Sequence, residues 1–186
     1  MTERDVHTLP ADLPVPEDDG ACDHLPGVEI PSLRLASTEG GETDLGEATA
    51  EGTTVLFIYP RTGKPGQPLP PGWDLIPGAR GCTPQSCAFR DLHSEFAERG
   101  VRVIGLSPQS HADQMEFAER EHLGFPLLSD ETLTLAEAIG LPTFEAAGMT
   151  LYKRVTLGIS DGAIAKAFYP VFPPDQNAAT VLAWLA

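Results

Sequence analysis

The sequence is poor in cysteine, in basic residues and in long apolar runs, and each shortage excludes a class of protein. A chain of 186 residues with three cysteines has too few of them for a disulfide scaffold. Its 12 lysine and arginine residues stand against 27 aspartate and glutamate residues, for a formal net charge of −15. Nucleic acids and anionic membrane surfaces are bound by clustered basic residues, so we expect neither as a partner.

The N-terminal segment has little apolar periodicity. No apolar run in the chain approaches the roughly 18 residues of a membrane span, and MTERDVHTLPADLPVPEDDGACD is acidic where a signal peptide is basic and then apolar. We therefore expect a cytoplasmic protein. Residues 1–27 are interpreted as an acidic arm, flexible or draped over the surface, in which Cys22 is inert, and residues 28–186 as one folded domain.

Segments with strand and helix periods alternate along the rest of the chain. TTVLFIYP, residues 53–60, and VRVIGLSP, residues 101–108, are apolar runs typical of buried central strands. Amphipathic helices are expected after them, and TLYKRVTLGIS and AIAKAFYPVF are joined by the hairpin signal Asp-Gly. The pattern predicts an α/β protein whose sheet is flanked by helices and ends in an antiparallel hairpin.

A long loop is expected to precede the helix that carries two of the cysteines. Residues 61–81 are rich in proline and glycine, which excludes a helix or a central strand. For the helix that follows, Thr83 is the expected N-cap, Pro84 the first helical residue and Gly100 the stop. This start places Cys82 at the positive end of the helix.

The stretch GCTPQSCAFRD holds Cys82 and Cys87 five positions apart. A thiol at a helix N-terminus has its thiolate stabilised, which lowers a thiol pKa from about 8.5 toward neutrality. Cys82 has that position and Cys87 does not, so the two are chemically unequal, as suits a redox couple. Zinc sites need a second ligand pair, and only His93 lies nearby, so no metal is expected. The remaining alternative is that both cysteines are simply buried core residues.

At this point the sequence resembles a known family. VLFIYP, GCTPQSCAFRD, VRVIGLSP, FAEREHLGFPLLSDE and AEAIGLP follow one another as they do in the peroxiredoxins of the bacterioferritin comigratory protein or peroxiredoxin Q branch. The resemblance runs from about residue 28 to the C-terminus. It implies a thioredoxin-like fold with a central mixed β-sheet flanked by helices, and a peroxidase that uses neither metal nor any other cofactor.

The resemblance also implies roles for particular residues. Cys82 would be the peroxidatic cysteine and Cys87 the cysteine that resolves it, while Arg154, on the strand KRVTLGIS, would hold the thiolate and the peroxide. Pro60 most resembles the proline of the active-site motif, and Gly81 precedes the peroxidatic cysteine. The implied partners are a hydroperoxide substrate and a thioredoxin-like thiol reductant, and the protein is expected to be a monomer or a weak homodimer.

Two departures from the family pattern concern the peroxide-binding groups. Ala79 stands where the family has a hydroxyl three residues before the peroxidatic cysteine, and residues 61–81 form an insertion between Pro60 and Cys82. The replacement donor could be Thr62, Thr83, or a backbone N–H of Gly81 or Cys82, among which the sequence does not choose. The insertion could bring Trp73 and Leu75 over the site as a lid for apolar hydroperoxides, or could be a plain surface loop.

The predicted function is reduction of hydrogen peroxide and organic hydroperoxides by Cys82, followed by a Cys82–Cys87 disulfide that an external thiol donor reduces. Two alternatives stay open. One is a general thiol-disulfide oxidoreductase on the same fold. The other is a non-enzymatic redox sensor or interaction protein in which the loss of the hydroxyl at Ala79 has ended turnover.

Overall fold

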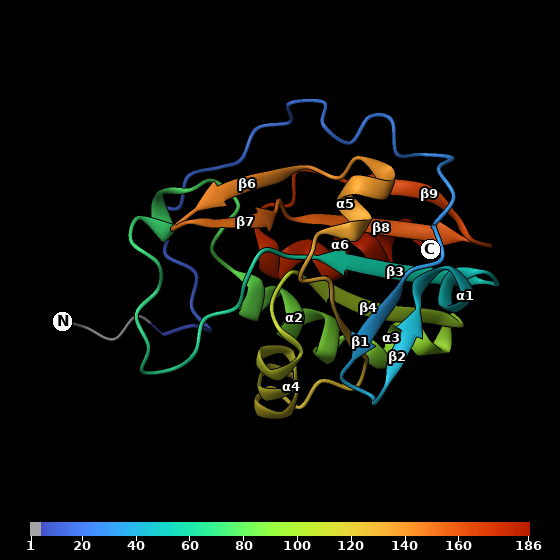
Figure 1. Cartoon of the computed structure of the whole chain (residues 1–186), viewed down its shortest axis with the longest axis horizontal. Coiled ribbons are helices and arrows are strands. Elements are labelled where there is room, and N and C mark those ends of the chain that lie inside the picture. The colour runs from blue at the N-terminus through green and yellow to red at the C-terminus, as the bar shows by residue number, and fades with distance from the viewer. Residues whose placement is uncertain (1–4) are drawn as a thin grey trace.

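The structure is a computed structural model that describes residues 5–186. Figure 1 shows a mixed sheet through the middle of the molecule, with helices on both sides and the arm along one edge. The strands are β1 (Arg34–Ser37), β2 (Glu42–Asp44), β3 (Thr53–Ile58), β4 (Val101–Ser107), β5 (Leu127–Ser129), β6 (Thr143–Ala146), β7 (Met149–Tyr152), β8 (Val155–Ser160) and β9 (Ala163–Phe168). The α-helices are α1 (Leu45–Thr49), α2 (Cys82–Asp91), α3 (His93–Glu98), α4 (His111–Arg120), α5 (Thr134–Ile139) and α6 (Asn177–Trp184), with single 3₁₀ turns at Trp73–Leu75 and Pro174–Gln176.

The main sheet has the strand order β2-β1-β5-β4-β3-β8-β9. β3, β4 and β5 run parallel, and β8 and β9 add an antiparallel edge next to β3. This is the α/β architecture with a central mixed sheet that the sequence predicts. The turn Asp161–Gly162 joins β8 to β9, as the Asp-Gly signal indicates, with φ of 47° and 83° at the two residues.

The central strand β3 is buried on both faces, which explains its continuous apolar sequence. Its alternate residues belong to two different cores. Val55 and Phe57 pack with Phe89 of α2, Phe96 of α3, Phe117 of α4 and Val181 of α6. Leu56 and Ile58 face the other core, which α1, α5 and the arm residues Cys22 and Leu25 complete. The helix carrying the cysteine pair is therefore held against the sheet, with the rings of Phe57 and Phe89 stacked 4.5 Å apart.

Three local expectations are wrong. The helix predicted over residues 82–100 is divided into α2 and α3 at Leu92, whose φ of −99° and ψ of 8° leave the helical region. Its N-cap is Gly81 and not Thr83, so Cys82 and not Pro84 is the first helical residue. The run TLYKRVTLGIS is two strands: β7 pairs with β6 in a separate two-stranded sheet, and β8 begins after Arg154.

Residues 5–27 of the arm form turns but no helix or strand, and they lie against the domain. Asp19 accepts hydrogen bonds from Lys153 and Tyr169, and Cys22 and Leu25 enter the core. The remainder of the predicted arm, residues 1–4, lies outside the described residues, and the division into arm and domain stays a prediction. Within residues 5–186, no helix is long and apolar enough to cross a bilayer.

Candidate active site

Cys82 is the first residue of α2 and follows the long loop that leaves the central strand β3. The backbone N–H groups of a first helical turn have no partner within the helix, and the macrodipole is positive there, so this end stabilises an anion. The Cys82 side chain is 3% exposed, and it packs in the core formed by β3 and α2. The predicted position of Cys82 at the positive end of a helix is therefore confirmed.

Arg154 meets the sulfur of Cys82. Ile58 pairs with Val155, so Arg154 lies just past the carboxyl end of β3, where Pro60 is also buried. Its Nη2 donates to Cys82 Sγ over 3.2 Å, and the same nitrogen donates to the carbonyl oxygens of residues 78–80 at 3.1 to 3.2 Å. Arg154 is 3% exposed, which keeps water from screening its charge beside the sulfur.

A chain of buried polar groups fixes the guanidinium from its other side. Arg154 Nη1 donates to Gln85 Oε1 at 2.5 Å, and Gln85 Nε2 donates to Asn177 Oδ1 at 2.9 Å. Thr156 Oγ1 donates to the same Asn177 oxygen at 2.7 Å. Asn177 thus joins α2, β8 and α6, and Gln85 connects this junction to the arginine that touches the sulfur. Sequence reasoning missed Gln85, Asn177 and Thr156, because no spacing rule connects residues on three elements.

Gly81 is required by the backbone before Cys82. Its φ of 107° is one that residues with a side chain rarely adopt. A Cβ there would lie 2.3 Å from Pro174 Cγ and 2.9 Å from Leu9 Cδ2. Gly81 therefore allows the loop to turn into α2 while the arm and the Pro174 turn press against it.

A small cavity of about 10 Å³ lies beside Cys82, and Gly81 and Thr83 are among its lining residues. The volume is about that of a single small molecule such as water. Trp73 of the insertion and Val6 of the arm also line it, whereas Leu75 is 80% exposed and points away from the core. Thr62 instead exchanges hydrogen bonds with Gln109. Of the side chains considered as replacement for the hydroxyl missing at Ala79, Thr83 is the one that lines the cavity.

Cys87 lies five residues further along α2, about 1.4 turns from Cys82. The sulfurs of Cys82 and Cys87 are both free thiols. The Cα atoms of residues five apart in an α-helix lie roughly 8.6 Å from each other, whereas a disulfide needs less than about 7 Å. The helix must therefore open before the two cysteines can be bridged.

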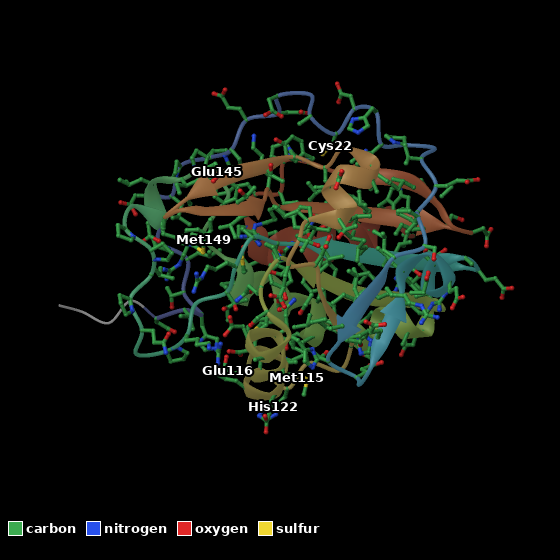
Figure 2. The ribbon with its side chains drawn as sticks, viewed as in Figure 1. Cys22, Met115, Glu116, His122, Glu145 and Met149 are labelled. Carbon is green, nitrogen blue, oxygen red and sulfur yellow. The ribbon has the colours of Figure 1, made fainter. Side chains whose placement is uncertain are left out.

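Cys87 and Cys22 have environments that suppress ionisation. Burial raises the pKa of the Cys87 thiol to about 11, and the neighbouring Glu121 adds to the effect. Burial likewise raises the pKa of the Cys22 thiol to about 12, together with Asp19 and Asp18. Cys22 belongs to the arm and enters the core on the face of the sheet opposite α2; Figure 2 labels it near the top of the view, with His122 at the bottom.

Comparison with known proteins places this geometry among thiol-dependent redox proteins. Residues 25–182 match the family described as Redoxin. A putative peroxiredoxin bcp of Coxiella burnetii is 28% identical over 159 residues, which are 84% of this chain and 95% of that protein.

Two solved structures share the fold. The crystal structure of peroxidoxin BcpB from Mycobacterium tuberculosis superposes with a TM-score of 0.68 at 29% identity, covering 87% of this chain and 96% of that one. A structure of the bacterioferritin comigratory protein of Xanthomonas campestris, described for its alkyl peroxide reduction activity, gives 0.65 at 25% identity, with 95% and 97% covered. The predicted thioredoxin-like fold and the resemblance to this branch are confirmed.

Proposed function

The chain belongs to the redoxin family, in the bacterioferritin comigratory protein and peroxiredoxin Q branch of the peroxiredoxins, and from this premise we propose that Cys82 is its peroxidatic cysteine and Cys87 its resolving cysteine. The protein is a peroxiredoxin, a thiol-dependent peroxidase that reduces hydroperoxides and is recycled by a thioredoxin-type reductant. The observation that supports the role of Cys82 is its contact with Arg154 at the positive end of α2.

In the first step, the thiolate of Cys82 attacks one oxygen of the peroxide. The S–O bond forms as the O–O bond breaks, sulfur is oxidised to a sulfenic acid, and the other oxygen takes up a proton and leaves as water or an alcohol. Arg154 stabilises the negative charge that moves from sulfur to the leaving oxygen. We assign Thr83, which lines the cavity beside Cys82, as the hydrogen-bond donor to the bound peroxide, and Pro60 and Gly81 as the residues that shape the peroxide site.

In the second step, the thiol of Cys87 displaces the oxygen of the sulfenic acid. The disulfide forms, and the thiol proton leaves with the hydroxyl group as water. An external dithiol then reduces the disulfide by exchange and becomes oxidised itself. Because the disulfide of this cycle must be reduced again by a thiol donor, we assign the protein to the reducing cytoplasm. We also propose that it acts as a monomer or a weak homodimer.

Steady-state consumption of hydrogen peroxide with thioredoxin, thioredoxin reductase and NADPH tests the proposal. A peroxidase oxidises many equivalents of NADPH per chain and is oxidised by one equivalent of peroxide far faster than free cysteine. A redox sensor would consume one equivalent and stop. A thiol-disulfide oxidoreductase would react faster with a small disulfide than with peroxide. Either of these two results would overturn the assignment.

A further inference from the structure

Cys87 belongs to a polar cluster that connects α2 with the end of α4 and with the arm. Its Sγ donates to Glu121 Oε2 at 3.4 Å. His7 Nε2 lies 2.9 Å and 3.0 Å from the two oxygens of the same carboxylate. The Glu121 side chain is 5% exposed. One buried carboxylate thus joins the arm to the helix that carries the resolving cysteine. Figure 2 labels His122, the residue after Glu121, just past the end of α4.

The cluster has the composition of a zinc site but not its charge. His7, Cys87 and Glu121 place possible ligand atoms within 4.8 Å of one another, and zinc accepts all three types. However, Arg120 Nη1 lies 2.5 Å from Glu121 Oε1, and Arg90 Nη1 lies 3.8 Å from Oε2. Two guanidinium groups already neutralise this carboxylate and would repel a divalent cation. We therefore treat the cluster as a hydrogen-bond network.

The same part of the arm lies over the surroundings of Cys82. Arg80 Nη2 donates to the carbonyl oxygens of Asp5 at 2.8 Å and of Thr8 at 3.3 Å. Val6 lines the cavity beside Cys82, and Leu9 packs against Gly81. Residues 5–9, which we call the strap, therefore contact the neighbourhoods of both redox cysteines.

The contact between Cys87 and Glu121 cannot survive disulfide formation. The helix must open for Cys87 to approach Cys82, and its thiol must leave the carboxylate. The same contact also opposes ionisation of Cys87, since burial and Glu121 together keep the pKa of this thiol at about 11. A thiolate beside a buried carboxylate is the less favourable state.

We propose that Glu121 and His7 are positioning residues for the resolving step: they hold Cys87 in α2 as a neutral thiol and so slow formation of the Cys82–Cys87 disulfide. The inference rests on the roles proposed above for the two cysteines. The reaction itself is unchanged, with the thiol proton leaving in the water formed from the sulfenic hydroxyl. The holding contact lengthens the life of the sulfenic acid and thereby exposes it to further oxidation by a second peroxide.

The network makes the resolving step depend on pH through His7. Asp5 faces the imidazole from the strap, Glu121 faces it from the end of α4, and Arg90 and Arg120 flank that carboxylate. The hydrogen bond to Glu121 raises the pKa of His7 above its usual value near 6.5. The charged pair is complete below that usual value and is lost as the pH rises through the raised pKa. The resolving step should therefore accelerate in this window, above pH 6.5.

The test separates the two chemical steps in the full chain. Reduced protein is mixed with one equivalent of hydrogen peroxide and quenched with acid at millisecond intervals. Mass spectrometry then counts free thiol, dimedone-trapped sulfenic acid and disulfide. The variants are Glu121→Gln and His7→Gln, and the matched controls are Glu119→Gln and His122→Gln, which alter exposed residues near the same helix end.

We expect disulfide formation to be about 3–10 times faster in Glu121→Gln and His7→Gln, which is the effect of losing one hydrogen bond. The rate at which peroxide oxidises the Cys82 thiol should stay the same. Ionisation of the Cys87 thiol accelerates the resolving step with rising pH in every variant, so the readout for His7 is the ratio of the His7→Gln rate to the wild-type rate. This ratio should fall toward one as the pH rises above 6.5, whereas a merely structural effect would leave it constant. The control variants should match the wild type. A resolving rate that is unchanged or slower in both test variants overturns the proposal, and a slower rate in Glu121→Gln would make that carboxylate a general base instead.

A second measurement is independent of peroxide chemistry. In a background with Cys82→Ser and Cys22→Ser, the rate at which iodoacetamide alkylates Cys87 should rise with Glu121→Gln and with His7→Gln. If the wild-type protein fails to react with peroxide but this rise occurs, the proposed function fails and the holding contact stands. An unchanged alkylation rate in His7→Gln, whose half-exposed side chain leaves folding intact, overturns the contact itself.

Discussion

Arg154 Nη2 donates to the sulfur of Cys82 over 3.2 Å, although 72 residues separate the two in the chain. The other contacts of the guanidinium fix its position beside the sulfur. They are three successive carbonyl oxygens before α2 and the side chain of Gln85 within α2. The two Nη groups of a planar guanidinium can face Gln85 on one side and the sulfur with the carbonyl oxygens on the other, whereas an ammonium group presents a single point of charge.

The first prediction follows from this geometry. Arg154→Lys and Arg154→Ala should each slow oxidation of Cys82 by peroxide at least about tenfold, because neither provides the fixed donor that stabilises the charge on sulfur and leaving oxygen. The measurement is the second-order rate of thiol loss with hydrogen peroxide. Arg102→Lys, at an exposed position on β4, is the control. Equal rates in all of these proteins would remove Arg154 from the site.

The second prediction assigns the three thiols. Cys82→Ser should abolish turnover. Cys87→Ser should keep the reaction with the first equivalent of peroxide and lose turnover with a thioredoxin-type donor. Cys22→Ser should match the wild type, since the Cys22 thiol is buried with its pKa raised to about 12. NADPH-coupled turnover and single-turnover thiol counting distinguish these cases. Activity that persists in Cys82→Ser and disappears in Cys87→Ser would reverse the assignment.

The third prediction concerns the backbone before the peroxidatic cysteine. Gly81→Ala should lower the free energy of unfolding by about 1–3 kcal/mol through its left-handed φ alone, and further through the clash with Pro174. It should also slow peroxide reduction by displacing Cys82. Gly100→Ala has a φ of 69° with open space around the added methyl, so it separates the conformational effect from the clash. Urea denaturation should rank Gly81→Ala below Gly100→Ala; the same loss in both would contradict the packing argument.

The fourth prediction is that the first turns of α2 open when the disulfide forms, because residues five apart on a helix are too distant to be bridged. Amide hydrogen exchange at residues 85–90 should be protected in the reduced protein and fast in the oxidised one. Exchange at β4 provides the internal reference and should stay slow in both. Equal protection of residues 85–90 would require Cys82 to be resolved by another thiol.

Much of the fold could be predicted because its decisive elements carry strong local patterns. A few residues are enough to predict β3 and β4 from their apolar runs and the hairpin turn from Asp161–Gly162. The errors fall where local signals conflict. The run from Thr150 to Ser160 reads as one strand, but the chain changes partners at Lys153 and Arg154 and so divides it between two sheets.

The site divides in a similar way. Cys82 and Cys87 stand out by their spacing and by the helix start, whereas Arg154 could be named only through resemblance to a family. His7 could not be found from the sequence, because its partner Glu121 is 114 residues away and no spacing rule connects the two. Tertiary packing alone brings them together, and no period or spacing records it.

The burial of Cys22 gives the protein an internal probe that is independent of its chemistry. The arm carries this thiol into the core on the face of the sheet opposite α2, so a reagent can reach it only after the arm has lifted away. Its labelling rate in the native protein measures how often that undocking occurs, as amide exchange does for backbone hydrogen bonds. The three cysteines thus report on three depths of the same molecule: the reaction at Cys82, the opening of α2 at Cys87, and detachment of the arm at Cys22.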